Sequence, residues 1–502
     1  MTNIRLHIKI LLAATILMVS CKHTLELDPT HLVPDAQMWR TKNDARSAVF
    51  ATYGMFRAAL ADNNAYLAYG ELRGGDFSSA SRSDLDAVTG NQLNATYTTL
   101  ENWKNWRRFY AAIAQANLCL EKLSLVHEND FRYTVEEMKL DIANIRFLRA
   151  LTYFYLVRIW GDVPMVTTTT DGSFTPVQRE SQAKILAMAG QDATAAAAGL
   201  PWQYNQQYPE QQSPYWGQGG ALWKGVIASK GAAYALLAHI AAWSGDYLVT
   251  EKYTRLAIDN KAAGGYTFAD VATLTGVDGT FAGQAPNVIF ALPFNKTYQE
   301  SSAGGHIEDW ALAEPFISRV SPDIYVSNDS ILRIFNEPGD LRFKVGDGGA
   351  ASGNYFTGFG NPLPMFTKIK QLSITGADPL RSFQSAIIIF RYEELVLLRA
   401  EAMLFLSKNP DAIQLLNSVR AQRGLPAFKA TDGNLAQAIL QERRRELLGE
   451  GWRWYDLVRF DKLTDYSRFT SADIAAGAQW WPVAKDVLDG SKQIIQNKFW
   501  QQ

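Results

Sequence analysis

The sequence predicts a mostly α-helical protein in which tetratricopeptide-like helix pairs form a scaffold with long irregular insertions and a few short strands. Two observations support this fold class. The stretch Asp141–Pro164 is apolar around so much of its circumference that other helices must cover it on several sides. A pattern of helix, tight break and return helix then occurs twice further along the chain. Such pairs bury their apolar faces by stacking on neighbouring pairs.

The central helix has recognisable ends. Thr134, followed three residues later by Glu137, is the capping-box signature of a helix start. Gly161 is typical of a helix end, and Pro164 cannot continue a helix. Apolar residues between these ends recur at spacings of three and four: Phe147, Leu151, Phe154 and Val157. We therefore expect a core helix that begins near Thr134 and ends at Gly161.

The two helix pairs have small residues on one face and a tight break in the middle. The first pair joins Ala232–Ser244 to Tyr247–Asp259, and the second joins Tyr392–Ser407 to Ala412–Arg423. The spacing between the pairs is irregular, so the pattern indicates a diverged helical array. An ordinary helical bundle is the alternative architecture.

The N-terminus resembles an export signal. Within Met1–Ser20, Arg5 and Lys9 supply a basic start, and the apolar run Ile10–Val19 is too short to span a bilayer. A cysteine, Cys21, directly follows the small residue Ser20. This order predicts cleavage before Cys21 and attachment of lipid to its thiol, as in bacterial lipoproteins. A plain secretion signal with an incidental cysteine is the alternative.

Composition narrows the functional class. Removing Arg5 and Lys9 from the 49 basic residues leaves 47, against 50 acidic residues, in the mature chain. This slightly negative balance provides no basic surface for nucleic acid. Cys119 is the second of two cysteines, so no intramolecular disulfide framework can form in the exported chain. A large apolar core must therefore supply the stability.

The first third of the mature chain alternates between helical and irregular sequence. Thr41 and Asp44 resemble another helix cap, and helical spacing continues to Leu60. Ala61–Glu101 lacks periodicity and contains GELRGGDFSSASRSD. An irregular segment of about forty residues inside a compact domain is usually functional or disordered. Helical spacing resumes over Trp103–Leu120.

The rest of the chain shows the same alternation. The helix Arg179–Ala198 precedes a loop dense in glutamine and aromatic residues: Trp202, Tyr204, Tyr208, Tyr215 and Trp216. Two further irregular regions follow, Lys261–Asp323 and the glycine-rich Gly346–Gly360. A strand-like run occurs at Val288–Phe294. Ile387–Phe390 leads into the helix at Tyr392, and a last long helix is expected at Leu435–Leu448.

Five motifs resemble successive motifs of the SusD/RagB family, which consists of outer-membrane nutrient-binding lipoproteins of Bacteroidetes. They are IRFLRALTYFYLVRIWGDVPMV, ASKGAAYALLAHIAAWSGDY, FRYEELVLLRAEAMLF, LLNSVRAQRGLP and ERRRELLGEGWRWYDLVRF. The resemblance covers nearly the whole chain. It implies a signal peptide at 1–20 and one domain at 21–502, with an N-terminal part at about 21–320 and a C-terminal part at about 321–502.

The family resemblance also implies a location and a partner. We expect four tetratricopeptide-like pairs as the scaffold and irregular loops that carry the ligand site. We also expect a lipid-anchored protein on the outer membrane that faces the cell exterior. Its partner would be a TonB-dependent (SusC-like) transporter barrel, over which it sits as a lid.

Catalytic motifs are missing from the sequence. It contains no GxSxG, HExxH or GxxxxGK motif, and no two histidines stand at metal-ligand spacing. His306 is a lone loop histidine, and Glu308 and Asp309 are neighbours in sequence, which does not define a catalytic pair. We therefore expect a protein that is not an enzyme and has neither a cofactor nor a metal.

Aromatic and polar residues in the irregular segments suggest a sugar site. Aromatic faces cover the apolar faces of a sugar ring, while Asp, Asn and Arg hydrogen-bond its hydroxyl groups. The candidates are Tyr66, Arg73, Asp76, Arg82, Asn91, Tyr97, Tyr298 and Trp310. Three hypotheses remain: a glycan-binding lipoprotein, which we favour, an oligopeptide-binding lipoprotein of the same type, and a glycan-cleaving enzyme.

Overall fold

A computed structural model describes residues 38–169, 177–294, 300, 304–374 and 381–501. Helices dominate this part of the chain, and the strands are short. The predicted mostly α-helical class is therefore confirmed. Cys21 and Tyr298 lie outside the described residues.

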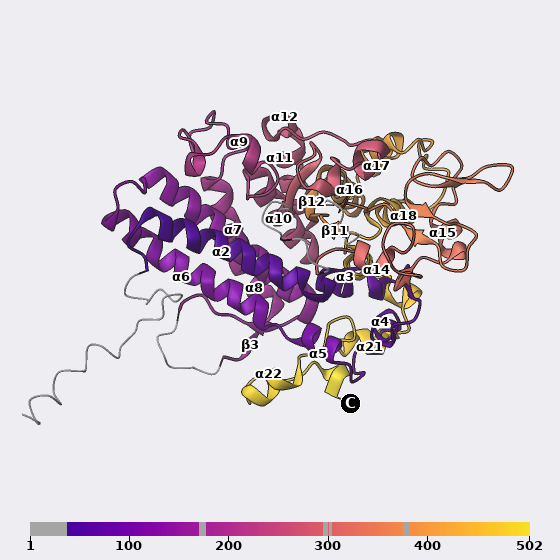
Figure 1. The fold of residues 1–502 in the computed structure, drawn as a ribbon, viewed down its shortest axis with the longest axis horizontal. Helices are drawn as coiled ribbons and strands as arrows, with labels where there is room; N and C mark the ends of the chain where they lie inside the picture. The colour runs from indigo at the N-terminus through magenta and orange to yellow at the C-terminus, as the bar shows by residue number, and fades with distance from the viewer. Residues whose placement is uncertain (1–37, 170–176, 295–299, 301–303, 375–380, 502) are drawn as a thin grey trace, which may run out of the picture.

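Four pairs of long helices form the scaffold. In chain order, the pairs are α2 (Lys42–Ala61) with α6 (Arg107–Asn129), α7 (Val135–Trp160) with α8 (Gln182–Gly199), α10 (Lys230–Trp243) with α11 (Tyr247–Asp259), and α16 (Tyr392–Phe405) with α17 (Asn409–Gln422). Adjacent pairs stack through α6 on α7, α8 on α10, and α11 on α16. Figure 1 shows this array running from α2 and α6 on the left to α16 and α17 on the right. The helical array is thus confirmed over the ordinary bundle.

The central helix α7 is buried along most of its length. A complete capping box between Thr134 and Glu137 begins it. Gly161 ends it with φ +77°, and a Cβ at this position would lie 2.9 Å from the Trp480 ring. α7 contacts α2, α6 and α8, which explains why its sequence is apolar on several sides.

Short helices form in the segment that we predicted to be irregular. Between α2 and α6 the chain forms α3 (Ala65–Gly70), α4 (Ser83–Thr89) and α5 (Thr98–Lys104). The prediction that Ala61–Glu101 is irregular throughout was therefore wrong. Each of these helices has two turns or fewer, so none is long enough to show an apolar period.

The remaining helices connect or cap the scaffold, and all of them are short except the one at Leu435–Leu447. The α-helices are α9 (Gly220–Trp223), α12 (Lys261–Gly264), α13 (Val271–Thr275), α14 (Glu308–Ala311), α15 (Asn328–Ile334), α18 (Leu435–Leu447), α19 (Arg453–Arg459), α20 (Leu463–Tyr466), α21 (Ser471–Ala475) and α22 (Lys485–Gly490). The 3₁₀ turns are η2 (Asp62–Asn64), η3 (Leu72–Gly74), η4 (Tyr215–Gly217), η5 (Thr280–Ala282) and η7 (Lys498–Gln501).

The strands pair two by two. β4 (Val288–Leu292) pairs antiparallel with β12 (Ile387–Arg391), and every residue of both is buried. The strand-like run seen in the sequence is therefore a strand, and its partner is the segment that leads into α16. The other pairs are β1 (Ser78–Ser79) with β5 (Ile324–Tyr325), β2 (Val163–Pro164) with β3 (Arg179–Glu180), β6 (Lys344–Val345) with β7 (Ala351–Ser352), β8 (Phe356–Thr357) with β9 (Met365–Phe366), and β10 (Leu372–Ile374) with β11 (Arg381–Phe383).

Candidate functional site

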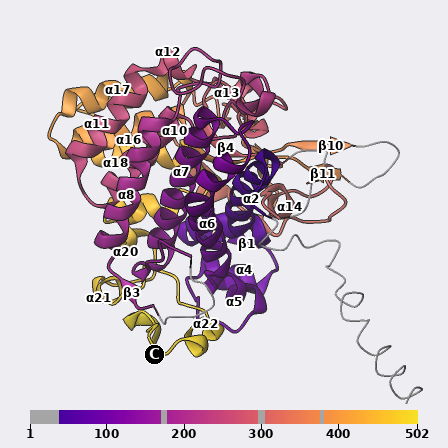
Figure 2. The ribbon, with the colours of Figure 1, turned by 90° about the vertical axis from the view of Figure 1, so that its left-hand side faces the viewer.

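The first two irregular segments of the sequence meet at one surface. β1 pairs with β5, the Ala80 N–H donates to the Asp323 carbonyl (2.8 Å), and the Asp323 N–H donates to the Trp310 carbonyl (2.7 Å). Figure 2 shows β1, α4, α5 and α14 on the same side of the molecule. We call the residues gathered here the loop junction: Arg82, Asp84, Thr99, Asp309, Trp310, Arg319 and Asp323. Tyr97 stands two residues before Thr99 in the chain.

Opposite charges alternate across the loop junction. Arg82 contacts Asp84 (Nη2 to Oδ2, 2.6 Å) and Asp323 (Nη1 to Oδ2, 3.6 Å). Arg319 contacts Asp323 (3.0 Å) and Asp309 (3.2 Å). About a third of each arginine side chain is exposed, 33% for Arg82 and 32% for Arg319. The row therefore offers solvent both hydrogen-bond donors and acceptors.

Protonation at the junction follows from these contacts. Burial alone would raise the pKa of Asp84, but the hydrogen bond and charge of Arg82 outweigh it and lower that pKa. A further hydrogen bond from Thr99 acts in the same direction. For Asp309, burial raises the pKa despite the opposing charge of Arg319. Asp84 is therefore an ionised acceptor at neutral pH.

The aromatic residues at and beside the junction differ in accessibility. Tyr97, which precedes α5, has 39% of its surface exposed. Trp310 is only 2% exposed, with the Arg82 guanidinium 5.5 Å from the centre of its ring. Trp310 therefore supports Arg82 from below and offers no open face for a sugar. Phe316, half-buried beneath Lys370, is an additional aromatic near Arg319 that sequence reasoning missed.

Besides Trp310, four of the predicted site residues lie in the protein interior. Tyr66, Arg73, Asp76 and Asn91 are all buried. The interpretation of these residues as accessible loop positions was therefore wrong, and in this structure they hold the scaffold together.

Arg73 and Asn91 tie the first irregular segment to the C-terminus. Arg73 donates to the Asn91 side chain (2.8 Å) and to the carbonyls of Ala478 (2.9 Å) and Gln479 (2.8 Å). Its guanidinium lies 3.8 Å from the centre of the Trp454 ring. Each of its three nitrogens donates to a protein group and the side chain is fully buried, so it is not accessible to a ligand.

The motif GELRGGD makes two further ties to the C-terminal motif. Asp76 accepts a hydrogen bond from Arg444 Nε (2.8 Å). Glu71 accepts from the N–H groups of Gly449 and Gly451, both at 2.9 Å. A buried charge is stable only when it is paired or hydrogen-bonded, and residues more than 350 positions away provide these partners. Sequence spacing contains no signal for such pairing.

The alternative to a binding site is a catalytic site, and His306 and Glu308 are its strongest candidates. The Ser385 hydroxyl donates to Glu308 (2.7 Å), and the His306 Nδ1 lies 3.1 Å from the same hydroxyl. Burial lowers the pKa of His306 to about 4 and raises that of Glu308 to about 7. All three residues are buried, so no substrate reaches the serine in this structure.

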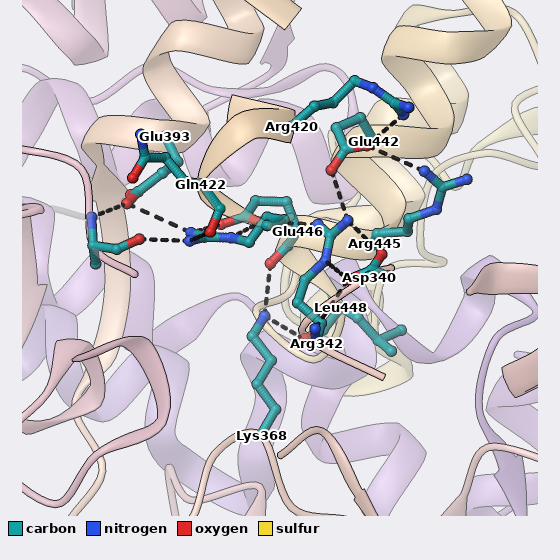
Figure 3. Close-up of polar contacts among 12 residues, drawn as sticks. Asp340, Arg342, Lys368, Glu393, Arg420, Gln422, Glu442, Arg445, Glu446 and Leu448 are labelled. Carbon is teal, nitrogen blue, oxygen red and sulfur yellow. Dashed lines mark hydrogen bonds and ion pairs between the residues drawn. The ribbon is translucent and has the colours of Figure 1, made fainter. Parts of the chain in front are cut away.

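A second cluster of charged residues lies beneath the C-terminal helices. Figure 3 shows Arg342 between Asp340, Glu442 and Glu446, and Lys368 below them. The closed set comprises six cations and six carboxylates of the described chain: Arg342, Lys368, Arg391, Arg420, Arg423 and Arg445 with Glu337, Asp340, Glu393, Glu442, Glu446 and Glu450. We call it the buried ion network. Its neutrality and burial indicate a structural role.

The described part of the chain contains no group of three His, Cys, Asp or Glu side chains arranged to hold a metal ion. Within the same residues, no helix combines the length and apolarity needed to cross a membrane. Cys119 is buried, and burial raises the pKa of its thiol to about 12.

Two family models match this chain. The model described as "Starch-binding associating with outer membrane" matches residues 38–215, and the model described as "SusD family" matches residues 377–500. Among curated proteins, SusD-like protein P38 of Formosa agariphila is 26% identical over 485 residues, with 89% of each chain covered.

Solved structures show the same relationship. A SusD superfamily protein from Bacteroides thetaiotaomicron is 40% identical, covers 92% of this chain and 100% of its own, and has a TM-score of 0.84. A structure described as a laminarin-binding SusD-like protein is 22% identical, with 91% and 99% coverage and a TM-score of 0.69, which shows a shared fold. The chain has the family's motifs and helix pairs, and one relative is 40% identical along nearly the whole chain. The chain therefore belongs to the SusD/RagB family.

Proposed function

We propose that this protein is a cell-surface binding protein that captures oligosaccharides at the loop junction and passes them to a TonB-dependent transporter barrel. Family membership supports the class. The starch-binding description of one family model and the laminarin-binding description of a structural relative support a glycan as the cargo.

The observation that carries the proposal is the alternating charged row of the loop junction. A glycan presents hydroxyl groups that both donate and accept hydrogen bonds. Arg82 and Arg319 provide charged donors, and Asp84 and Asp323 provide charged acceptors, all partly exposed. Tyr97 adds an exposed aromatic side chain for the apolar face of a sugar ring.

The same geometry favours binding without cleavage. Glycoside hydrolysis needs one carboxylic acid to donate a proton and a second carboxylate to act as base or nucleophile. At the junction, Asp84 pairs with Arg82, and Asp309 and Asp323 share Arg319. The hydrogen bond and charge of Arg82 lower the pKa of Asp84, which opposes proton donation from that carboxyl.

Affinity at such a site is expected to be modest. Each sugar contact displaces ordered water, so the net gain per contact is small. We expect dissociation constants between micromolar and millimolar, or about −8 to −4 kcal/mol. Weak binding also suits a capture protein, because tightly held cargo would not be released to the transporter.

Attachment at the membrane follows from the N-terminal sequence. Lipid on Cys21 would hold the protein at the outer membrane, where the family model's description also places association. One acyl chain gives only marginal binding, so stable retention needs at least two. We propose that the protein faces the cell exterior, where it meets glycans.

Titration calorimetry with a glycan panel tests the binding site. Arg82→Ala and Tyr97→Ala should each weaken binding about tenfold, equivalent to about 1.4 kcal/mol. Arg132→Ala is the matched control, because Arg132 also forms a two-point contact with an aspartate two residues away, at the start of α7. The control should bind like wild type.

Three results would overturn the proposal. Wild-type affinity in both Arg82→Ala and Tyr97→Ala would remove the loop junction from the site. Binding of a peptide library with no glycan binding would favour the oligopeptide alternative. Release of shorter sugars during long incubation, abolished by changing one carboxylate, would identify an enzyme.

A further inference from the structure

A second pocket lies far from the loop junction, under the loop that is dense in glutamine and aromatic residues. Its volume is about 470 Å³, within the usual range for small-ligand sites. Residues 202–206, the helix α9 and the segment around Tyr266 form its walls. α9 and α12 lie at the top of Figure 1, whereas α4 and α5 of the loop junction lie near the bottom.

The pocket is rigid because its aromatic residues are held by the protein. The Tyr204 hydroxyl donates to the Ala228 carbonyl (2.8 Å), and Trp223 Nε1 donates to the Tyr215 carbonyl (3.2 Å). Tyr266 fills space left by two glycines, since a Cβ at Gly264 would lie 2.1 Å from its ring. A preformed site of this kind loses little entropy when it binds.

Two donor groups of the pocket lining remain available, one on Asn205 and one on Lys224. Asn205 Oδ1 accepts a hydrogen bond from the Gln207 N–H (3.2 Å), which orients the amide and leaves its NH₂ group without a partner among the described residues. Lys224 is half-buried, and no hydrogen bond or ion pair joins its side chain to another described residue. Every residue that lines the pocket is described, and Lys224 is the only charged one among them.

We propose that this pocket binds a single sugar unit that carries one anionic group, a carboxylate or a sulfate. The ammonium of Lys224 and the Asn205 amide would hold the anionic oxygens. Trp202, which is half-buried at the pocket wall, would cover one face of the sugar ring. This second site goes beyond capture at the loop junction and would let the protein distinguish charged from neutral glycans.

Saturation-transfer NMR titrations test the second site with three probes: galacturonic acid, galactose 6-sulfate and galactose. At least one of the anionic sugars should bind saturably to the full-length mature protein, and galactose should bind at least about tenfold more weakly. Higher salt should weaken the anionic binding, because it screens the charge of Lys224. The two anionic probes show whether the carboxylate or the sulfate is preferred.

Variants of Lys224 test whether the anionic sugars bind in this pocket. Lys224→Gln keeps a donor but removes the charge and should weaken anionic binding at least about tenfold. Lys224→Glu should abolish it. Lys122→Gln, at another half-buried lysine on α6, is the matched control and should bind like wild type. Because Lys224 has no partner to lose, its variants should melt at the wild-type temperature.

Binding at this pocket can be distinguished from binding at the loop junction. Arg82→Ala should retain anionic-sugar binding at the second pocket even if it loses the oligosaccharide. The proposal is overturned if neither anionic sugar binds the wild type saturably, if Lys224→Gln binds as well as wild type, or if galactose binds as tightly as the charged sugars. Loss of anionic binding in Arg82→Ala would also overturn it, by assigning that binding to the junction.

Discussion

Replacing Glu446 with Gln should destabilise the protein more than almost any other change of a single charge. Glu446 lies at the centre of the buried ion network and contacts three guanidinium groups. The distances are 3.0 Å to Arg342, 2.8 Å to Arg391, and 2.8 and 2.7 Å to Arg423. Glutamine has nearly the same shape, so the substitution removes charge and leaves the packing almost unchanged.

The expected loss follows from the charge balance. Burial alone would raise the pKa of Glu446, but Arg423 and Arg391 outweigh it and hold that pKa well below its usual range. The carboxylate is therefore ionised, and its removal leaves six buried cations facing five carboxylates. Removing one partner of a buried ion pair typically costs about 3–5 kcal/mol, because an uncompensated charge remains in the interior.

Equilibrium urea unfolding, followed by circular dichroism, measures this loss. Glu446→Gln should lower the unfolding free energy by about 3–5 kcal/mol, whereas Asp489→Asn, in the exposed pair with Lys485, should leave it unchanged within error. Adding Arg423→Met to Glu446→Gln should cost less than the sum of the single changes, with a coupling of about 0.5–3 kcal/mol. A loss below about 1 kcal/mol, or simple additivity, would refute the reasoning.

Three other predictions can be checked directly. Leu151→Ala, at a core position of α7, should cost about 2–5 kcal/mol in the same unfolding assay, and a loss under about 0.5 kcal/mol would mean that the position is not packed. Burial raises the pKa of Glu308 to about 7, so its contribution to stability is fully present below about pH 4.5 and is lost as the pH rises through 7. Relative to Glu308→Gln, wild type should therefore lose about 3 kcal/mol over this range, and parallel pH profiles for the two proteins would contradict the assignment. A tagged fatty acid should label wild type and not Cys21→Ala, which should appear in the soluble fraction; label that persists in the variant would disprove lipidation at this residue.

The sequence by itself determined the scaffold, because helix formation depends on neighbours three and four residues away. The capping boxes at Thr41 and Thr134 both form as expected. Helix α11 has the predicted limits Tyr247–Asp259, and α7 ends at Gly161 as predicted. The strand-like run that begins at Val288 could also be recognised, since buried strands are continuously apolar and rich in β-branched residues.

The candidate site was only partly predictable. The sequence pointed to two irregular segments that meet in the structure, and it named Arg82 and Tyr97, both of which are partly exposed. It did not identify Arg319 or Asp323, whose importance arises only from their contacts across the junction.

Only the tertiary structure decided which polar residues face solvent. Arg73, Asp76 and Arg82 lie within ten positions of one another in the same irregular segment. The first two are buried, because Gln479 and Arg444 supply their partners from the C-terminal end of the chain. Arg82 pairs with Asp84 and Asp323 at the surface and stays partly exposed. The cost of burying a charge depends on what the fold places beside it, and local sequence does not contain that information.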